Sequence, residues 1–324
     1  MSLNIKKGVK KAIIFFLILG LIFTVVVTVT NLAGDRLFPR KTMEILIDSD
    51  SGNEIDDLFA ITRALIAPEL EVIGLTSVHY AFAENAGDTS LSHSQYLNEK
   101  ILGLLKKENI PHPEGAKDML RFYGNPVPQA SPAASLIIRK AHETAKNKKL
   151  NIVTLGAMTN VASAIIMDPE IIPKIRVFMM GLKYDPVPKS WNKNEFNARN
   201  DLDAMDIVLN TAGLEIDIMT ASASSELVFG KPEAEKYLRG KGGIWDFLIK
   251  KWDERFPQQQ EWIMWDVALI EALIDPSLTR SEKTLTPPEN TQRTVNVFTS
   301  VNKELMTASF YAAVIKAQRA QSDD

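Results

Sequence analysis

The feature that most constrains this chain is a dense run of acidic residues directly after a short apolar segment. Five acidic side chains fall within ten positions: Asp48, Asp50, Glu54, Asp56 and Asp57. The apolar segment 43–47 precedes them, and a helical pattern covers 55–66. A strand that leads through an acidic loop into a helix places carboxylates at the carboxyl end of a sheet, where open α/β folds bind ligands. Because these carboxylates repel one another, the run predicts a cation, and oxygen ligands favour Ca²⁺ or Mg²⁺.

Other interpretations of the acidic run stay open at this level. It could be solvated surface, and Asp or Ser before a helix is a common N-cap. The EF-hand pattern fails, because its glycine belongs five residues after the first Asp, where Asn53 stands. A phosphatase-type Asp-x-Asp pair, with Asp48 or Asp50 as nucleophile, would leave Asp56 and Asp57 without a role.

Composition excludes several other classes of function. The 324 residues, 45% of them hydrophobic, suffice for one large α/β domain or two small ones. A formal net charge of −3 gives no electrostatic footprint for nucleic acid. The chain has no cysteine, which excludes disulfides and thiolate chemistry, and its 4 histidines are not spaced as zinc ligands.

The N-terminal region predicts a membrane anchor. Residues 12–32 are uncharged and rich in Ile, Leu, Val and Phe, and four lysines precede them. About 20 apolar residues cross a bilayer, and basic flanks stay on the cytoplasmic side. We therefore expect residues 1–37 to hold a basic flank, a transmembrane helix and a linker, with an extracytoplasmic catalytic domain over 38–324. A cleaved signal peptide with a secreted domain is the alternative.

Beyond the anchor, strand-like apolar runs alternate with longer helical patterns. Predicted strands cover 43–47, 70–77, 150–155, 174–180, 214–220 and 294–299. Predicted helices cover 55–66, 92–107, 133–146, 160–167, 202–209, 264–273 and 303–317. This alternation predicts an α/β fold with a mainly parallel open sheet flanked by helices on both faces.

Three further segments stand out. The run 156–160 follows a predicted strand with a Gly turn, and alone it is typical of an ordinary strand-to-helix connection. The polar run 195–201 surrounds one aromatic residue, as a solvated loop also would. Asp266 follows Trp265 inside an apolar helical pattern, where a carboxylate is costly unless it caps, pairs or binds a metal. Asp266 is therefore the best candidate to meet the first acidic run across the fold.

Taken in order, these pieces resemble the nucleoside hydrolase family of Ca²⁺-dependent N-ribohydrolases, over about residues 44 to 276. Four motifs match in register, at Asp48, Asp50, Gly52, Asp56 and Asp57; at Gly156, Thr159 and Asn160; at Glu195, Phe196, Asn197 and Asp201; and at Trp265 and Asp266. The resemblance implies hydrolysis of the N-glycosidic bond of ribonucleosides to free base and ribose, as in nucleoside salvage.

The resemblance also implies a metal site. Ca²⁺ would be bound by Asp50, Asp57, Asp266 and the backbone carbonyl of Leu155. Asp50 would in addition act as general base on a Ca²⁺-bound water.

Substrate contacts follow from the same resemblance. Asp48 and Asp56 would support the site and hold ribose hydroxyls, and Glu195 and Asn197 would grip the ribose near its 5′ end. Asn160 joins these substrate-binding residues. Trp265 would stack on the base, which favours purine nucleosides.

The chain also departs from the family pattern. The acidic loop 50–57 is two residues longer than the common family version, and His79 lies where many members have an Asn that contacts ribose. Two alternatives therefore stand beside the first: a hydrolase of another N-ribosyl compound, and a non-catalytic Ca²⁺-dependent nucleoside- or sugar-binding protein. Members are commonly homo-oligomers, although no interface is visible in this sequence.

Overall fold

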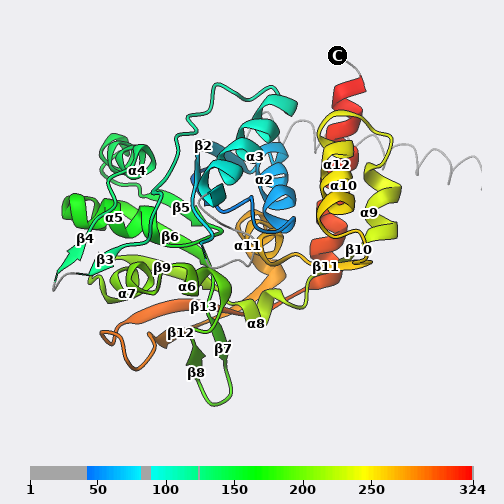
Figure 1. The fold of residues 1–324 in the computed structure, drawn as a ribbon. Helices are drawn as coiled ribbons and strands as arrows, with labels where there is room; N and C mark the ends of the chain where they lie inside the picture. Colours follow the sequence, from blue (N-terminus) through cyan, green and yellow to red (C-terminus); the bar gives the residue numbers. More distant parts are fainter. Residues whose placement is uncertain (1–41, 82–88, 123–124, 323–324) are drawn as a thin grey trace, which may run out of the picture. The chain divides into compact units, whose positions relative to one another are not determined.

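The central sheet explains how the chain gathers its acidic residues. The computed structural model describes residues 42–81, 89–122 and 125–322. The sheet consists of β1 (Met43–Ser49), β2 (Leu70–Ser77), β5 (Leu150–Thr154), β6 (Ile175–Met180), β9 (Glu215–Met219), β12 (Thr279–Leu285) and β13 (Thr294–Val301). Its order is β12-β13-β9-β6-β5-β1-β2 (Figure 1). Neighbouring strands pair in parallel except β12 and β13, which are antiparallel.

Helices cover both faces of this sheet (Figure 1). One apolar core lies under α2 (Asp56–Ile66), α3 (Ser90–Leu104), α9 (Lys231–Leu238), α10 (Gly243–Arg255), α11 (Trp265–Ile274) and α12 (Lys303–Ser322). The other core lies under α4 (Pro132–Glu143), α5 (Thr159–Met167) and α7 (Leu202–Asn210). Short helices α6 (Phe196–Asn200), α8 (Ala221–Ser224), η2 (Pro169–Lys174) and η3 (Pro276–Leu278) complete the set.

Successive side chains along each central strand point alternately into the two cores. In β1, Ile45 and Ile47 pack into the core on one face, and Leu46 packs into the core on the other. In β6, Phe178 belongs to the first core and Val177 to the second. Successive side chains of a strand point to opposite faces, so a parallel strand covered on both sides reads as a continuous apolar run.

Three two-stranded antiparallel sheets lie outside the central sheet. β3 (Arg121–Phe122) pairs with β4 (Pro126–Val127), and β7 (Lys183–Asp185) forms a hairpin with β8 (Ser190–Asn192). β10 (Val228–Gly230) pairs with β11 (Glu261–Ile263), although α9 and α10 lie between them in the chain. The hairpin β7–β8 follows β6 directly and begins beside the candidate site described below.

The sequence prediction holds for the layered α/β architecture. All six predicted strands form, each within two residues of its predicted ends. The prediction lacked β12, an edge strand whose side chains are polar and half-exposed, so that no apolar run marks it. It also lacked α9 and α10, which lie between the third and fourth motifs.

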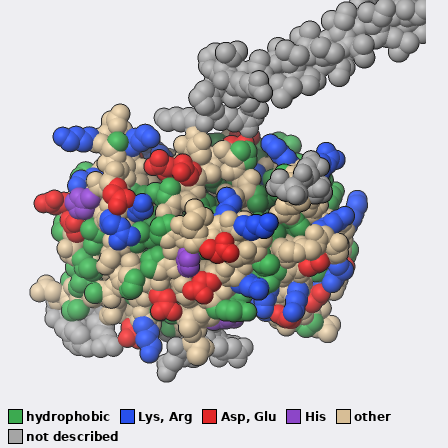
Figure 2. All heavy atoms as spheres, turned by 90° about the horizontal axis from the view of Figure 1, so that it is seen from above, with side chains coloured by type: hydrophobic (Ala, Val, Ile, Leu, Met, Phe, Trp, Pro, Cys, Tyr) green, Lys and Arg blue, Asp and Glu red, His purple; other side chains and the backbone are tan. Residues whose placement is uncertain are grey.

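The predicted membrane helix is withdrawn from the fold class, and with it the predicted membrane-anchored, extracytoplasmic localisation. Among the described residues, no helix is long and apolar enough to cross a membrane. The longest of them, α12, has 20 residues and carries Lys303, Glu304, Lys316 and Arg319. Charged side chains are scattered over the face drawn in Figure 2. The segment 12–32, on which the prediction rested, lies outside the described residues.

A buried ion pair joins two helices that carry candidate site residues. Arg63 of α2 donates from Nε to Oε1 of Glu271 in α11 at 2.6 Å, and both side chains are almost fully buried. Ser309 of α12 donates to Oε2 of Glu271 at 2.7 Å. These contacts fix α2 against α11, and Figure 1 shows the two helices side by side.

We expect Glu271→Ala to lower the free energy of unfolding by about 3–5 kcal/mol, because Arg63 would remain buried without its partner. Urea unfolding followed by circular dichroism measures this loss. Glu215→Ala, which removes the half-exposed partner of Lys149, should cost less than about 1 kcal/mol. Equal losses in the two variants would show that the buried pair has no special role.

Candidate functional site

The edge at which the parallel strands end gathers the acidic residues. β1 ends at Ser49, and the next loop carries Asp50 before α2 begins at Asp56. α11 begins at Trp265, so Asp266 also lies in the first turn of a helix. Carboxylates in a first turn are stabilised by unpaired backbone N–H groups and by the positive end of the helix dipole. The fold therefore directs two helix N-termini, with their acids, to one place.

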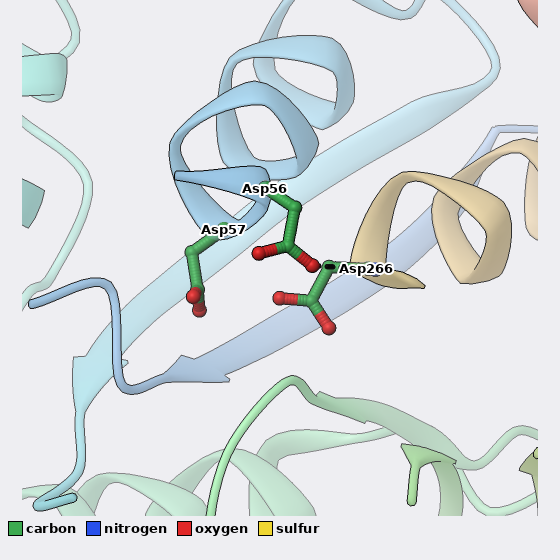
Figure 3. Close-up of side chains that lie close together, drawn as sticks. All are labelled: Asp56, Asp57 and Asp266. Carbon is green, nitrogen blue, oxygen red and sulfur yellow. Dashed lines mark hydrogen bonds between the residues drawn. The ribbon is translucent and has the colours of Figure 1, made fainter. Parts of the chain in front are cut away.

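Asp56, Asp57 and Asp266 form a tight, buried cluster. Each offers a carboxylate oxygen, and these oxygens lie within 4.8 Å of one another. Figure 3 shows the three carboxylates close together, two from α2 and one from α11. Ser49 Oγ donates to Asp57 Oδ1 at 2.6 Å, and the backbone N–H of Asp266 donates to Asp56 Oδ2 at 3.2 Å. So few donors do not offset three buried negative charges, and the cluster requires protons or a cation.

Asp50 completes the acidic group from the side of the loop. It is 2% exposed, and its Oδ2 atom has no hydrogen-bond partner among the described residues. Burial raises the pKa of Asp50 well above its ordinary value, and the charges of Asp57 and Asp56 add to this. Burial and neighbouring carboxylates also raise the pKa of Asp56 and Asp266, and burial raises that of Asp57 to about 6. An orphaned carboxylate oxygen beside three more carboxylates fits a cation that takes oxygen ligands.

The turn after β5 brings a backbone carbonyl close to Asp50. A Cβ atom at Gly156 would lie 2.9 Å from both Cβ and Cγ of Asp50, so only glycine allows this approach. The backbone N–H of Leu155 donates to the carbonyl of Asp48 at 2.8 Å. Asn197 Nδ2 donates to the Leu155 carbonyl at 3.0 Å. The predicted carbonyl ligand Leu155 is thus held in place with one lone pair still available.

A pocket of about 450 Å³ opens over this group, within the range of roughly 300–1,000 Å³ that small-molecule sites occupy. Eight of the ten predicted site residues line it: Asp50, Asp56, Asp57, Leu155, Glu195, Asn197, Trp265 and Asp266. The structure therefore brings together residues from three motifs that are far apart in the sequence, with Leu155, which directly precedes the remaining motif. Their individual roles stay predictions.

The other two predicted residues, Asp48 and Asn160, are not among those that line the pocket. Asp48 Oδ1 accepts hydrogen bonds from Thr76 Oγ1 at 2.6 Å and from Asn160 Nδ2 at 2.9 Å. Asn160 Nδ2 also donates to the Ser77 carbonyl at 3.0 Å, and its Oδ1 accepts from the backbone N–H of Ala116 at 2.8 Å. Burial raises the pKa of Asp48 to about 7. The pair braces the ends of β1, β2 and α5.

Glu195 serves as the N-cap of α6. Its Oε1 accepts from the backbone N–H of Asn197 at 3.1 Å, and its Oε2 accepts from those of Ala198 at 3.0 Å and Leu182 at 3.2 Å. Burial raises the pKa of Glu195, and these backbone donors oppose the rise. The Glu195 carboxylate therefore accepts three backbone hydrogen bonds without any substrate.

His79, which stands where the family has a ribose contact, is not among the pocket residues. It is buried, with Nε2 3.0 Å from Thr159 Oγ1, and Thr159 Oγ1 donates to Asp201 Oδ2 at 2.7 Å. Burial lowers the pKa of His79. Its neighbour Tyr80 places its hydroxyl 2.8 Å from Nδ1 of His93.

Arg255, which no sequence motif marked, clamps the long acidic loop. Its Nη1 donates to the carbonyl of Glu54 at 2.8 Å and to that of Ser51 at 3.4 Å, and its Nη2 donates to the carbonyls of Gly52 and Asn53. Its positive charge also lowers the pKa of Glu54, although burial raises that pKa to about 7 overall. The extra length of this loop is thus held by one guanidinium at the end of α10.

The same loop is held from its other side by α3. Ser51 Oγ donates to Asn98 Oδ1 at 2.7 Å, and the backbone N–H of Gly52 donates to Ser94 Oγ at 3.2 Å. Glu54 and Asn53 line the pocket and were missed as site residues, although Glu54 belongs to the acidic run itself. Arg255 has no comparable signal, because its role depends entirely on tertiary packing.

We expect the metal-free protein to lose stability as the pH rises from about 4 to about 7. Asp57 has a raised pKa of about 6 against an ordinary 3.8, so the folded state holds its proton more tightly and the benefit disappears as that proton leaves. This carboxyl alone corresponds to about 3 kcal/mol. Urea unfolding in a chelator across this pH range measures it.

Added Ca²⁺ should raise the melting temperature more at pH 8 than at pH 5, because the ion binds ionised carboxylates. Asp57→Ala and Asp266→Ala should remove this shift, whereas Asp203→Ala, on the exposed side of α7, should keep it. The same melting temperature with Ca²⁺ and with chelator in the unmodified protein would contradict a cation site.

Comparisons with known proteins agree on one family. A family model described as inosine-uridine preferring nucleoside hydrolase matches residues 45–317. A probable uridine nucleosidase 2 of Arabidopsis thaliana is 26% identical over 244 residues, 67% of this chain and 69% of that protein. A pyrimidine-specific ribonucleoside hydrolase RihA of Salmonella typhi is 30% identical over 202 residues, 54% of this chain and 61% of that protein. A solved inosine-guanosine nucleoside hydrolase superposes with a TM-score of 0.66 at 20% identity, over 84% of this chain and 98% of that one, which establishes the fold alone.

Proposed function

The chain belongs to the inosine-uridine preferring nucleoside hydrolase family, and from this premise we propose that it hydrolyses the N-glycosidic bond of ribonucleosides in the acidic pocket. Its relatives are named as nucleosidases and ribonucleoside hydrolases, so its class is that of enzymes that act on N-glycosyl compounds. The observation that carries the proposal is the meeting of Asp50, Asp56, Asp57 and Asp266 in one pocket of about 450 Å³.

A Ca²⁺ ion is the cofactor that best suits this donor set. Asp50, Asp57, Asp266 and the carbonyl of Leu155 would hold it, and Asp56 lies within reach in the same cluster. All these donors are oxygen atoms, which hard cations prefer. When bound, the ion would neutralise the carboxylates and lower the pKa of a water molecule in the site.

Asp50 is the residue we assign as general base. Asp50 lines the pocket, and its Oδ2 atom is buried and free of hydrogen bonds among the described residues, so it can take a proton from the attacking water. The remaining carboxylates stabilise the positive charge that develops on the ribosyl group as the bond from C1′ to the base breaks.

Ribose is the part of the substrate that we place against the end of β6. Asn197 uses its Nδ2 on the carbonyls of Leu155 and Met180, which leaves its Oδ1 as an acceptor for a ribose hydroxyl. Glu195 lies beside it in the pocket. Asp48 and Asn160 then act indirectly, because their hydrogen bond holds the strand ends near these groups.

Trp265 lines the pocket next to Asp266 and is the residue we assign to the base. An indole ring stacks on any base, and it covers a purine over a larger area than a pyrimidine. We therefore propose a preference for purine nucleosides, although the relatives in sequence are named for uridine and pyrimidines.

Asp50→Asn should lower kcat for ribose release from inosine and uridine by about 10²–10⁴-fold, because it removes a general base at nearly constant size. Asp203→Asn, on the exposed side of α7, is the matched control and should leave kcat unchanged. Ribose is measured in the presence of Ca²⁺. If the unmodified protein releases none, while Ca²⁺ still raises its melting temperature, the proposed activity is wrong and a Ca²⁺-dependent binding protein remains.

Trp265→Ala should weaken the use of inosine more than that of uridine. A loss of about 1–3 kcal/mol of stacking raises KM for the purine by roughly 5- to 150-fold. Steady-state kinetics with both nucleosides measures the ratio. Trp191→Ala serves as the control, because Trp191 donates to the Leu285 carbonyl and is not among the residues that line the pocket. Equal losses for the two substrates would remove Trp265 from the base site.

A further inference from the structure

Two cationic side chains at the rim of the pocket have no role in the reaction described above. Lys183 and Arg199 both line the pocket, and both are exposed. In the part of the chain that the structure describes, neither side chain forms an ion pair or a hydrogen bond. A neutral nucleoside would leave both charges without a partner in the bound state.

The order of the strands separates these cations from the acids. Along the sheet edge the order is β1, β5, β6 and β9. The aspartates Asp50, Asp56 and Asp57 follow β1, whereas Lys183 and Arg199 come from the segments after β6. Neighbouring strands lie about 4.8 Å apart, so the pocket changes from negative to positive over roughly two strand spacings. A ligand that lies along this edge meets both charges.

A strained turn at Leu182 directly precedes Lys183, one of the two cations. Leu182 has a φ of 60°, a conformation uncommon for residues other than glycine. Its N–H donates to Glu195 Oε2 at 3.2 Å, and its carbonyl accepts from the backbone N–H of Ala221 at 2.8 Å. These contacts hold the turn, and the next residue is Lys183. Strain of this kind concentrates at functional sites.

Glu195 follows β6 as the two cations do, and it forms no ion pair with either of them in the part of the chain that the structure describes. Glu195 lines the same part of the pocket, but its oxygens already accept from three backbone N–H groups. Ser222 and Ser225 also line the pocket. The Ser225 hydroxyl donates to the Ser222 carbonyl at 2.9 Å, whereas the Ser222 hydroxyl accepts from the backbone N–H of Tyr184 at 3.1 Å and still has its own proton to donate. The pocket therefore combines two positive charges with one neutral donor here.

We infer that the preferred substrate is an N-riboside that carries a phosphoryl group on its 5′ oxygen. The inference rests on the proposed function, because it takes the ribose to lie between the acidic group and the end of β6. A 5′-phosphate carries a charge of about −1.5 to −2. The guanidinium of Arg199 suits its oxygens in pairs, and Lys183 adds a point charge. Water adds to C1′ as the C1′–N bond breaks and the base gains a proton, so the products are the free base and ribose 5-phosphate.

Kinetics on four substrates tests this inference: inosine, uridine and their 5′-monophosphates, with Ca²⁺ present. We expect kcat/KM for the monophosphates to exceed that for the nucleosides by about tenfold or more. Lys183→Ala with Arg199→Ala should remove this preference and change nucleoside turnover by less than about threefold. A control pair outside the pocket, Lys250→Ala with Arg139→Ala, should change neither. Turnover of nucleosides but not monophosphates, or equal losses on both, would overturn the inference.

A binding measurement separates this inference from the proposed activity. Calorimetry with Ca²⁺ present compares ribose 5-phosphate with ribose on the full chain and on the double variant. If no N-riboside is hydrolysed, the proposed activity fails. The inference still holds if ribose 5-phosphate binds at least about tenfold more tightly than ribose and the double variant removes the difference. It fails if the two ligands bind alike.

Discussion

The structure depends on the burial of four aspartates at one edge of a parallel sheet. Asp50, Asp56, Asp57 and Asp266 are all buried, and carboxylate oxygens of the last three lie within 4.8 Å of one another. Few hydrogen-bond donors reach them. Burying one unpaired carboxylate costs several kcal/mol, and burying four beside one another costs more. The fold tolerates the arrangement because protons or a cation remove the charge. The same uncompensated negative charge makes the pocket a binding site, because a bound cation neutralises carboxylates that the protein itself leaves without partners.

The surrounding scaffold keeps this unfavourable group in one geometry. The ion pair Arg63–Glu271 holds α2 against α11. The first turns of these two helices carry three of the four aspartates. Arg255 and the side chains of α3 hold the loop that carries the fourth. Gly156 lets the β5 turn reach Asp50. Rigid support of this kind matters because displacement of a reacting group by about 1 Å can cost 10²-fold in rate.

Much of the fold and part of the site follow from local sequence. Parallel strands buried on both faces read as apolar runs, which is why six strands were predicted, and acids at strand ends point to the sheet edge. The edge strand β12 was missed because half-exposed polar side chains carry no such pattern. The roles of Arg255, Lys183 and Arg199 could not be predicted, because a cation has no local signature and its partner depends on the fold. Asp48 and Asn160 matched a motif, yet they bond to each other and are not among the residues that line the pocket.

The most direct test of the central claim counts the protons released when Ca²⁺ binds. Calorimetric titrations at pH 6, in two buffers that differ in ionisation enthalpy, give this number. Because burial raises the pKa of Asp57 to about 6 and the pKa values of Asp50 and Asp266 well above their ordinary value, the ion must displace protons, and binding should release about one or more of them. The number should fall as the pH rises to 9. Absence of Ca²⁺ binding, or binding without proton release at pH 6, would contradict a cation site built from these buried aspartates.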